Sequence, residues 1–176
     1  MSNEIVRLLI AFAGKPDDRA LKAAKAASDS LGREANICDI MVEESPVLSI
    51  ARNKAALRAK IKGYDYLFLL GPDILLEQQD ILQRLLKREK QAICPWLDSG
   101  DSQNSDPVFP RPEKEATLER LNWGSLDCCL FNMDAFLRLG LRPFADHGGE
   151  YDGLWFRACG VEWWMDLSVT AKRLAA

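Results

Sequence analysis

Apolar runs and amphipathic stretches alternate along the first half of the chain. Residues 5–12 are apolar except for Arg7, and Gly14 and Pro16 follow them, which is typical of a buried strand that ends in a turn. Further on, apolar residues recur either at helical spacing or in short continuous runs, with Gly or Pro near the boundaries. This pattern predicts strands over 5–12, 34–42, 64–70 and 91–97, and helices over 16–32, 48–63 and 75–87.

The second half of the chain has a looser pattern. Residues 98–112 are rich in Ser, Asp, Asn, Gly and Pro and show no periodicity, which predicts a long surface loop. Such a loop either contributes to a binding site or is a plain insertion. Beyond it we expect helices over 113–121, 134–139 and 151–159, and strands over 126–131 and 161–169.

Alternating strands and helices joined by short turns define an α/β class of fold. We expect a three-layer α/β/α sandwich whose sheet is mostly parallel, with helices on both faces and right-handed crossovers. The length of 176 residues suits a single domain with its own core. Ligands of such sheets bind beyond the carboxyl ends of the strands, so that edge is where a site is expected.

Composition narrows the choice of partner and compartment. The net charge of -3 gives no whole-chain attraction to nucleic acid, so we expect no nucleic-acid partner. No apolar run approaches the roughly 20 residues of a membrane helix, and the N-terminus lacks a basic leader. We therefore expect a cytoplasmic protein without a transmembrane segment.

The five cysteines show no C-x-x-C spacing and are odd in number. This pattern indicates neither a disulfide framework nor a zinc site, and we interpret the cysteines as buried thiols.

The stretch 49–73 combines a basic helix, a glycine stop, an apolar strand and an acid just past its end. Its periodicity places Ile50, Leu57 and Ile61 on the inward side of the helix, with the basic residues mostly outward. The strand end and the start of a helix that follows a strand share one edge of a sheet. A cationic helix start and a carboxylate are thus expected at the same edge, which is the geometry of a phosphate-handling site.

Arg52 and Asn53 lie in the first turn of this helix, where backbone donors and the helix dipole favour an anion. A guanidinium there can grip a diphosphate in bidentate fashion, or it can belong to a solvated charged face. Asp73 follows the strand 64–70 and reaches the same edge, although it could equally cap the helix expected after it.

Two strings carry a family resemblance. ARNKAALRAKIKGYDYLFLLGPDILL (residues 51–76) resembles the segment of GT-A-type glycosyltransferases, of the family 2 kind, in which an Ala-Arg-Asn helix precedes a strand that ends in an Asp-x-Asp metal motif. GGEYDGLWFRACGVEWWMDLSV (residues 148–169) is similar to their acidic segment, a Glu/Asp pair followed by a helix with an arginine. The resemblance implies a GT-A fold and sugar transfer from a nucleotide-diphosphate sugar to a hydroxyl acceptor of unknown identity.

The resemblance also implies roles for individual residues. The Asp-x-Asp motif, which holds Mn²⁺ or Mg²⁺ on the donor diphosphate, falls at Gly71-Pro72-Asp73, so Asp73 is the only acid that can be carried over as a metal contact. Arg52 and Asn53 match the pair that lies near the nucleotide. Glu150 and Asp152 match the acids that supply the general base, with the alternative that they only stabilise the start of the helix 151–159.

Several family marks differ in this chain. The first strand ends in Ala11-Phe12-Ala13-Gly14, where the family has a Pro-Thr-Tyr-Asn-like loop, and no histidine follows the last strand. The lone histidine, His147, lies just before the acidic pair. These differences and Gly71 leave a second hypothesis open, a non-catalytic GT-A-like binding or assembly module. A third is an unrelated doubly wound α/β protein in which both strings are coincidence.

Overall fold

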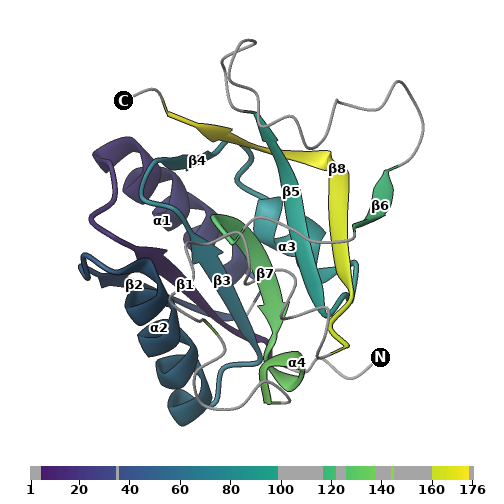
Figure 1. Cartoon of the computed structure of the whole chain (residues 1–176). Coiled ribbons are helices and arrows are strands. Elements are labelled where there is room, and N and C mark those ends of the chain that lie inside the picture. Colours follow the sequence, from purple (N-terminus) through teal and green to yellow (C-terminus); the bar gives the residue numbers. More distant parts are fainter. Residues whose placement is uncertain are drawn as a thin grey trace.

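A single sheet of eight strands joins the parts of the chain that the computed structural model describes, which are residues 5–34, 36–98, 117–121, 126–137, 144 and 160–174. The strand order is β2-β1-β3-β7-β5-β8-β4, and β6 pairs with β8 (Figure 1). The strands are β1 (Arg7–Ala13), β2 (Ile37–Glu43), β3 (Tyr66–Leu70), β4 (Ile74–Leu76), β5 (Ala92–Asp98), β6 (Leu118–Leu121), β7 (Cys128–Asn132) and β8 (Trp163–Arg173). The helices are α1 (Asp18–Gly32), α2 (Leu48–Lys62), α3 (Ile81–Leu86) and α4 (Met133–Leu137).

The sheet is mixed, so the expectation of a mostly parallel sheet is wrong. β1 is parallel to β2 and β3, and β5 is parallel to β8, but β7 runs antiparallel to both β3 and β5. β3 and β8 run in the same direction, since β3 and β5 are both antiparallel to β7 and β8 is parallel to β5. Only three residues separate β3 from β4, too few for the crossover that a parallel strand requires, so β4 reverses direction and pairs antiparallel with β8. One edge of the sheet therefore carries the carboxyl ends of β1, β2, β3, β5 and β8 together with the amino ends of β4 and β7. We call it the carboxyl edge.

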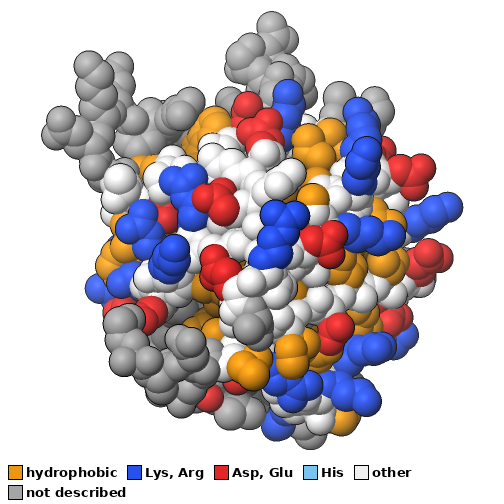
Figure 2. All heavy atoms as spheres, turned by 180° about the vertical axis from the view of Figure 1, so that it is seen from behind, with side chains coloured by type: hydrophobic (Ala, Val, Ile, Leu, Met, Phe, Trp, Pro, Cys, Tyr) orange, Lys and Arg blue, Asp and Glu red, His pale blue; other side chains and the backbone are white. Residues whose placement is uncertain are grey.

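Helices cover both faces of the sheet, as the α/β/α expectation required. α1 and α3 bury Ala24, Leu31 and Leu82 among others against one face, and α2 and α4 bury Ala55 and Ala135 against the other. Figure 2 shows the molecule from behind, where Lys and Arg side chains are interspersed with Asp and Glu. No helix among the described residues combines the length and the apolar character needed to cross a membrane.

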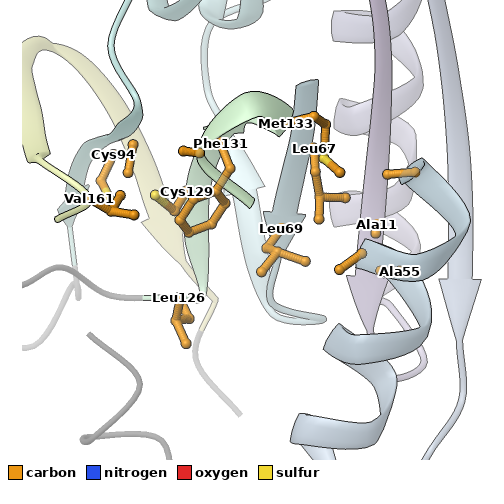
Figure 3. Packing of buried hydrophobic residues seen from close by; sticks show 14 of the residues in the cluster. Ala11, Ala55, Leu67, Leu69, Cys94, Leu126, Cys129, Phe131, Met133 and Val161 are labelled. Carbon is orange, nitrogen blue, oxygen red and sulfur yellow. The ribbon is translucent and has the colours of Figure 1, made fainter. Parts of the chain in front are cut away.

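Helix α2 packs on the sheet through small side chains. Ala51, Ala55 and Ala59 recur every four residues and are buried, and Ala55 faces the β1 residue Ala11 (Figure 3). The expectation that Ile50, Leu57 and Ile61 point inward is wrong, because all three are exposed and Ile61 is 71% exposed. The alanine row lets the helix backbone approach the sheet closely, which turns the larger aliphatic residues away. The predicted end of the helix is confirmed, since Gly63 caps it in a left-handed conformation with φ 66°.

Other boundaries changed where strands compete with helices. The helix expected over 75–87 is split into β4, which pairs with the end of β8, and the shorter helix α3. Residues 118–121 of the helix expected over 113–121 form β6 instead, because they pair with the first part of β8. The helix expected over 151–159 and the loop residues 99–112 lie outside the described residues.

Strand β8 bends where its register against β5 shifts. Pro95 pairs with Asp166, whereas the next residue, Trp96, pairs with Thr170, so three residues of β8 bulge out of the ladder. Figure 1 shows the consequence: β8 runs beside β5 and then turns across the top of the sheet toward β4. The bend carries the last residues of β8 to the carboxyl edge.

A buried aspartate holds the bend. Asp166 is fully buried, its Oδ2 lies 2.6 Å from Nε of Arg88, and its Oδ1 accepts hydrogen bonds from N and Oγ of Ser168. Burial alone would raise the pKa of Asp166, but the contact with Arg88 and the hydrogen bonds from Ser168 outweigh it and lower the pKa below its usual value. The ionised carboxylate therefore stabilises the fold above the unfolded pKa near 3.8, and this stabilisation is lost as the pH falls through the lower folded value.

We expect Arg88→Gln to lower the free energy of unfolding by about 2 kcal/mol at pH 7, less than for a fully buried pair because Arg88 is partly exposed. The loss should shrink at pH 3, which lies below the unfolded pKa near 3.8, because protonation of this carboxyl then favours the unfolded chain and weakens the contribution of the ion pair. Urea unfolding at both pH values measures this. Arg120→Gln is the matched control, since its pair with Glu162 is exposed on both sides and should contribute little. An equal loss in the two variants would contradict the role given to Asp166.

Candidate functional site

Two arginines and two aspartates form a continuous ion network at the carboxyl edge. Nη2 of Arg52 lies 3.0 Å from Oδ1 of Asp127, and Oδ2 of Asp127 lies 2.7 Å from Nη2 of Arg173. Nε of Arg173 lies 3.5 Å from Oδ2 of Asp73, which is an ion pair longer than a hydrogen bond. We call these four residues the carboxyl-edge network.

Backbone pairing places three members of the network side by side. Asp127 directly precedes β7, and its carbonyl accepts a 2.6 Å hydrogen bond from N of Gly71, just past β3. Arg173 ends β8 opposite Ile74 in β4, and N of Leu174 donates to the carbonyl of Asp73 at 2.8 Å. Their positions therefore follow from strand register and do not depend on the ion pairs alone.

The turn from β3 to β4 is supported by the turn after β1. The carbonyl of Pro72 accepts a hydrogen bond of 2.8 Å from N of Asp17, the residue that caps α1. Gly14 has φ 119°, a backbone conformation that residues with a side chain rarely adopt. A Cβ there would lie 3.4 Å from Cγ of Pro72. The ends of the neighbouring strands β1 and β3 are thus held together beside the network.

Arg52 is buried instead of lying on a solvated face. Only 6% of its side chain is exposed, and it lies behind Asp127, whose side chain is 34% exposed. The alanine row packs α2 on the sheet, and Arg52, the residue after Ala51, reaches Asp127 with its guanidinium. The expectation that Arg52 and Asp73 share one edge is confirmed, since Asp127 and Arg173 link them.

Asn53 holds another part of the chain. Its Nδ2 donates to the carbonyl of Phe144 at 2.7 Å, and its Oδ1 accepts from N of Phe144 at 3.1 Å. Both ends of the amide are thus committed to the backbone of one buried residue.

Glu150, Asp152 and His147 lie outside the described residues. The idea that Asp73 caps a following helix is wrong, because β4 follows it.

Asp127 and Arg173 were not predicted as site residues. A mostly parallel sheet would have put the start of the strand near 126 at the opposite edge, and it is the reversed direction of β7 that brings Asp127 to the site. Arg173 lies four residues beyond the predicted end of the last strand at 169. A signal for a longer strand exists in the alternation of residues 169–172, which continues the strand pattern past the predicted end and up to Arg173.

The carboxyl-edge network does not offer a set of ligands that fits a divalent metal ion. The residues that the structure describes contain no group of three or more His, Cys, Asp or Glu able to hold one. Asp73, the predicted metal contact, faces the guanidinium of Arg173, and so does Asp127. A second cation at these carboxylates would lie beside a permanent positive charge.

One buried cysteine adjoins the network, since Cys128 directly follows Asp127 in the chain. Cys94, Cys128 and Cys129 are buried thiols, as predicted, whereas Cys38 is only half-buried. Cys159 lies outside the described residues. Burial raises the pKa of Cys128 and of Cys129 well above the usual value. These thiols therefore stay protonated and serve as core side chains.

No family model matches the sequence, and no curated protein matches it. Solved structures do resemble the fold. A197 from STIV is 16% identical and superposes with a TM-score of 0.68 over 97% of this chain and 87% of that chain. GalNAc-T7, solved with UDP, GalNAc and Mn²⁺, is 11% identical with a TM-score of 0.63 over 99% of this chain, which spans only 45% of that one.

At these identities the likeness is one of fold alone. The chain has a GT-A-like fold with a mixed central sheet, and this part of the expectation from the sequence is confirmed. The doubly wound parallel sheet of the third hypothesis differs from the observed one, because β7 runs antiparallel to both of its neighbours.

Proposed function

We propose that this chain is a glycosyltransferase domain that binds a nucleotide-diphosphate sugar at the carboxyl edge and transfers the sugar to a hydroxyl acceptor. The observation that carries the proposal is the carboxyl-edge network, which places arginine side chains at the ligand-binding edge of a GT-A-like fold. Arginine is well suited to a diphosphate because its planar donors match pairs of phosphate oxygens. The UDP and GalNAc in the structure of GalNAc-T7 support a donor of this class.

The proposed sugar transfer breaks one bond, forms another and moves one proton. The bond from the sugar's anomeric carbon to the diphosphate oxygen breaks, and the diphosphate leaves with the electron pair. The acceptor oxygen forms the new bond to the same carbon, and its proton passes to a carboxylate. We assign the proton to Asp152 or Glu150 as general base, and the donor side to the carboxyl-edge network, which includes Arg52 and Asp73, with Asn53 beside Arg52 on α2. We route no step through a metal ion, because the described residues do not fit one.

Nucleotide binding is the first test. Isothermal titration with UDP- and GDP-sugars measures affinity, and release of UDP or GDP from the donor, with and without candidate acceptors, measures turnover. Binding together with release supports the proposal. Binding without release under all of these conditions favours the non-catalytic module, and no binding of either class of donor contradicts the proposed function.

Loss of the general base should separate turnover from binding. We expect either Asp152→Asn or Glu150→Gln to reduce turnover by about 100-fold, the lower end of what general-base catalysis contributes, while donor affinity changes little. Asp134→Asn is the matched control, because Asp134 is exposed on α4 and makes the same chemical change away from the network. If both acidic variants turn over donor as fast as Asp134→Asn, the base lies elsewhere and this assignment is wrong.

A further inference from the structure

We propose that the guanidinium of Arg173 supplies the positive charge for the diphosphate at the carboxyl edge, so that this chain binds a nucleoside diphosphate without a divalent metal ion. The inference rests on the proposed function and deepens it, because it assigns the diphosphate of the donor to one side chain. It follows from where the cations and carboxylates of the network lie.

Arg173 stands between the two carboxylates of the network. Its Nε is 3.5 Å from Asp73 and its Nη2 is 2.7 Å from Asp127, so one guanidinium bridges both acids. Mn²⁺ or Mg²⁺ needs several oxygen ligands at about 2 Å, and these two acids would be its nearest described ligands. A metal ion would have to displace the guanidinium or lie beside it, whereas the guanidinium is already in place and cannot lose its charge.

The two arginines of the network differ in access to a ligand. Arg52 is 6% exposed at its side chain, and Arg173 is 38% exposed. Arg52 is therefore a positioning residue that holds Asp127, and Asp127 in turn orients Arg173. A guanidinium has five N–H donors, and Nη1 of Arg173 takes part in neither ion pair, so we assign its donors to the diphosphate oxygens.

Arg173 is also held in place before any ligand arrives. Its strand position is fixed by pairing with Ile74, and the backbone of Leu174 is bonded to Asp73. A side chain that is already ordered costs little to use in binding. Asp73 is 46% exposed and its pair with Arg173 is the long one, so its carboxylate can turn into solvent when a diphosphate replaces it.

The wild-type chain provides the first test. Isothermal titration with UDP, GDP and inorganic pyrophosphate is carried out in EDTA and again in Mn²⁺. We expect the dissociation constants in the two buffers to agree within about twofold, because the cation that meets the diphosphate belongs to the protein. A gain in affinity of about tenfold or more with Mn²⁺ would overturn the inference while leaving the proposed function standing.

Variants of β8 provide the second test. We expect Arg173→Gln to weaken UDP binding in EDTA by about tenfold or more, and Arg173→Lys to weaken it less, since lysine keeps the charge but loses the planar fork. Lys172→Gln is the matched control: it removes the same charge one position earlier on the same strand, where the side chain lies on the other face of the sheet. Its affinity should stay within about twofold of the wild type.

Each outcome decides one of the two proposals. Equal affinities of Arg173→Gln and Lys172→Gln overturn the role of Arg173. If Arg173→Gln does not fold, as judged by its thermal unfolding, the metal comparison on the wild type and the Arg173→Lys variant still decide. Binding of none of the three probes in either buffer overturns the proposed function itself, and binding only with Mn²⁺ overturns this inference alone.

Discussion

Replacing Asp127 with alanine is expected to lower the free energy of unfolding by about 3 kcal/mol at pH 7, the low end of the range seen when a buried ion pair loses one partner, because Asp127 is itself partly exposed. Within the network, Asp127 contacts both arginines, so its loss removes the carboxylate that lies between two positive charges. One of those charges, on Arg52, is almost fully buried and cannot be screened by water.

Two further variants make this result specific. Asp127→Asn keeps the shape of the side chain and an oxygen acceptor but removes the charge, so we expect an intermediate loss. Glu162→Ala removes an acid of similar reach from an exposed pair with Arg120 and should cost less than about 1 kcal/mol. Urea unfolding followed by circular dichroism measures all three. If Asp127→Ala is as stable as Glu162→Ala, the network does not stabilise the fold.

Restoring the missing acid at Gly71 is expected to damage the site instead of creating a metal centre. A Cβ at this position would lie 3.1 Å from Cγ1 of Ile74, 3.2 Å from Oδ1 of Asp73 and 3.4 Å from the carbonyl of Asp127. Ile74 is fully buried, and the backbone of Asp127 is fixed by its hydrogen bond to Gly71, so neither can move freely. Space, more than backbone conformation, requires glycine here.

We therefore expect Gly71→Ala to lower the free energy of unfolding by about 2 kcal/mol through overpacking, and Gly71→Asp by about 3 kcal/mol because its charge also faces Asp73. Gly32→Ala is the matched control. It lies at the end of α1 with no neighbour within 4 Å of a Cβ, and it should be neutral or slightly stabilising. A Gly71→Asp protein that is as stable as the wild type and binds Mn²⁺ would show that the network adapts to a second acid.

The sequence predicted the first half of the fold better than the second. β1, α1, β2, α2 and β3 follow one another with clear periodicity and short turns, and each was found within a few residues of its predicted range. The direction of each strand was harder to predict, because the hydrophobic pattern indicates which residues are buried and not whether neighbouring strands run parallel or antiparallel. The direction of β7 depends on a long-range pairing with β3, and the short strands β4 and β6 exist only because β8 offers them a partner.

The same distinction explains what was predicted of the site. Arg52 and Asp73 lie in one local stretch, so a helix start and a strand end sufficed to bring them to the same edge. Asp127 and Arg173 reach that edge through a reversed strand and a bent one, which no local pattern shows. The inward face of α2 was predicted from the spacing of the large apolar residues Ile50, Leu57 and Ile61. Close packing of the helix on the sheet instead buries the alanine row.

The network also bears on the order of folding. Its ion pairs join residues 75 and 46 positions apart in the chain, and β4 meets the far end of β8. Contacts of such sequence separation form only after long loops have closed, which costs chain entropy and slows folding. The site should therefore be completed late, after β1, β2 and β3 have come together. Nucleotide binding during refolding would then report the docking of β8, the last step, and not the collapse of the core.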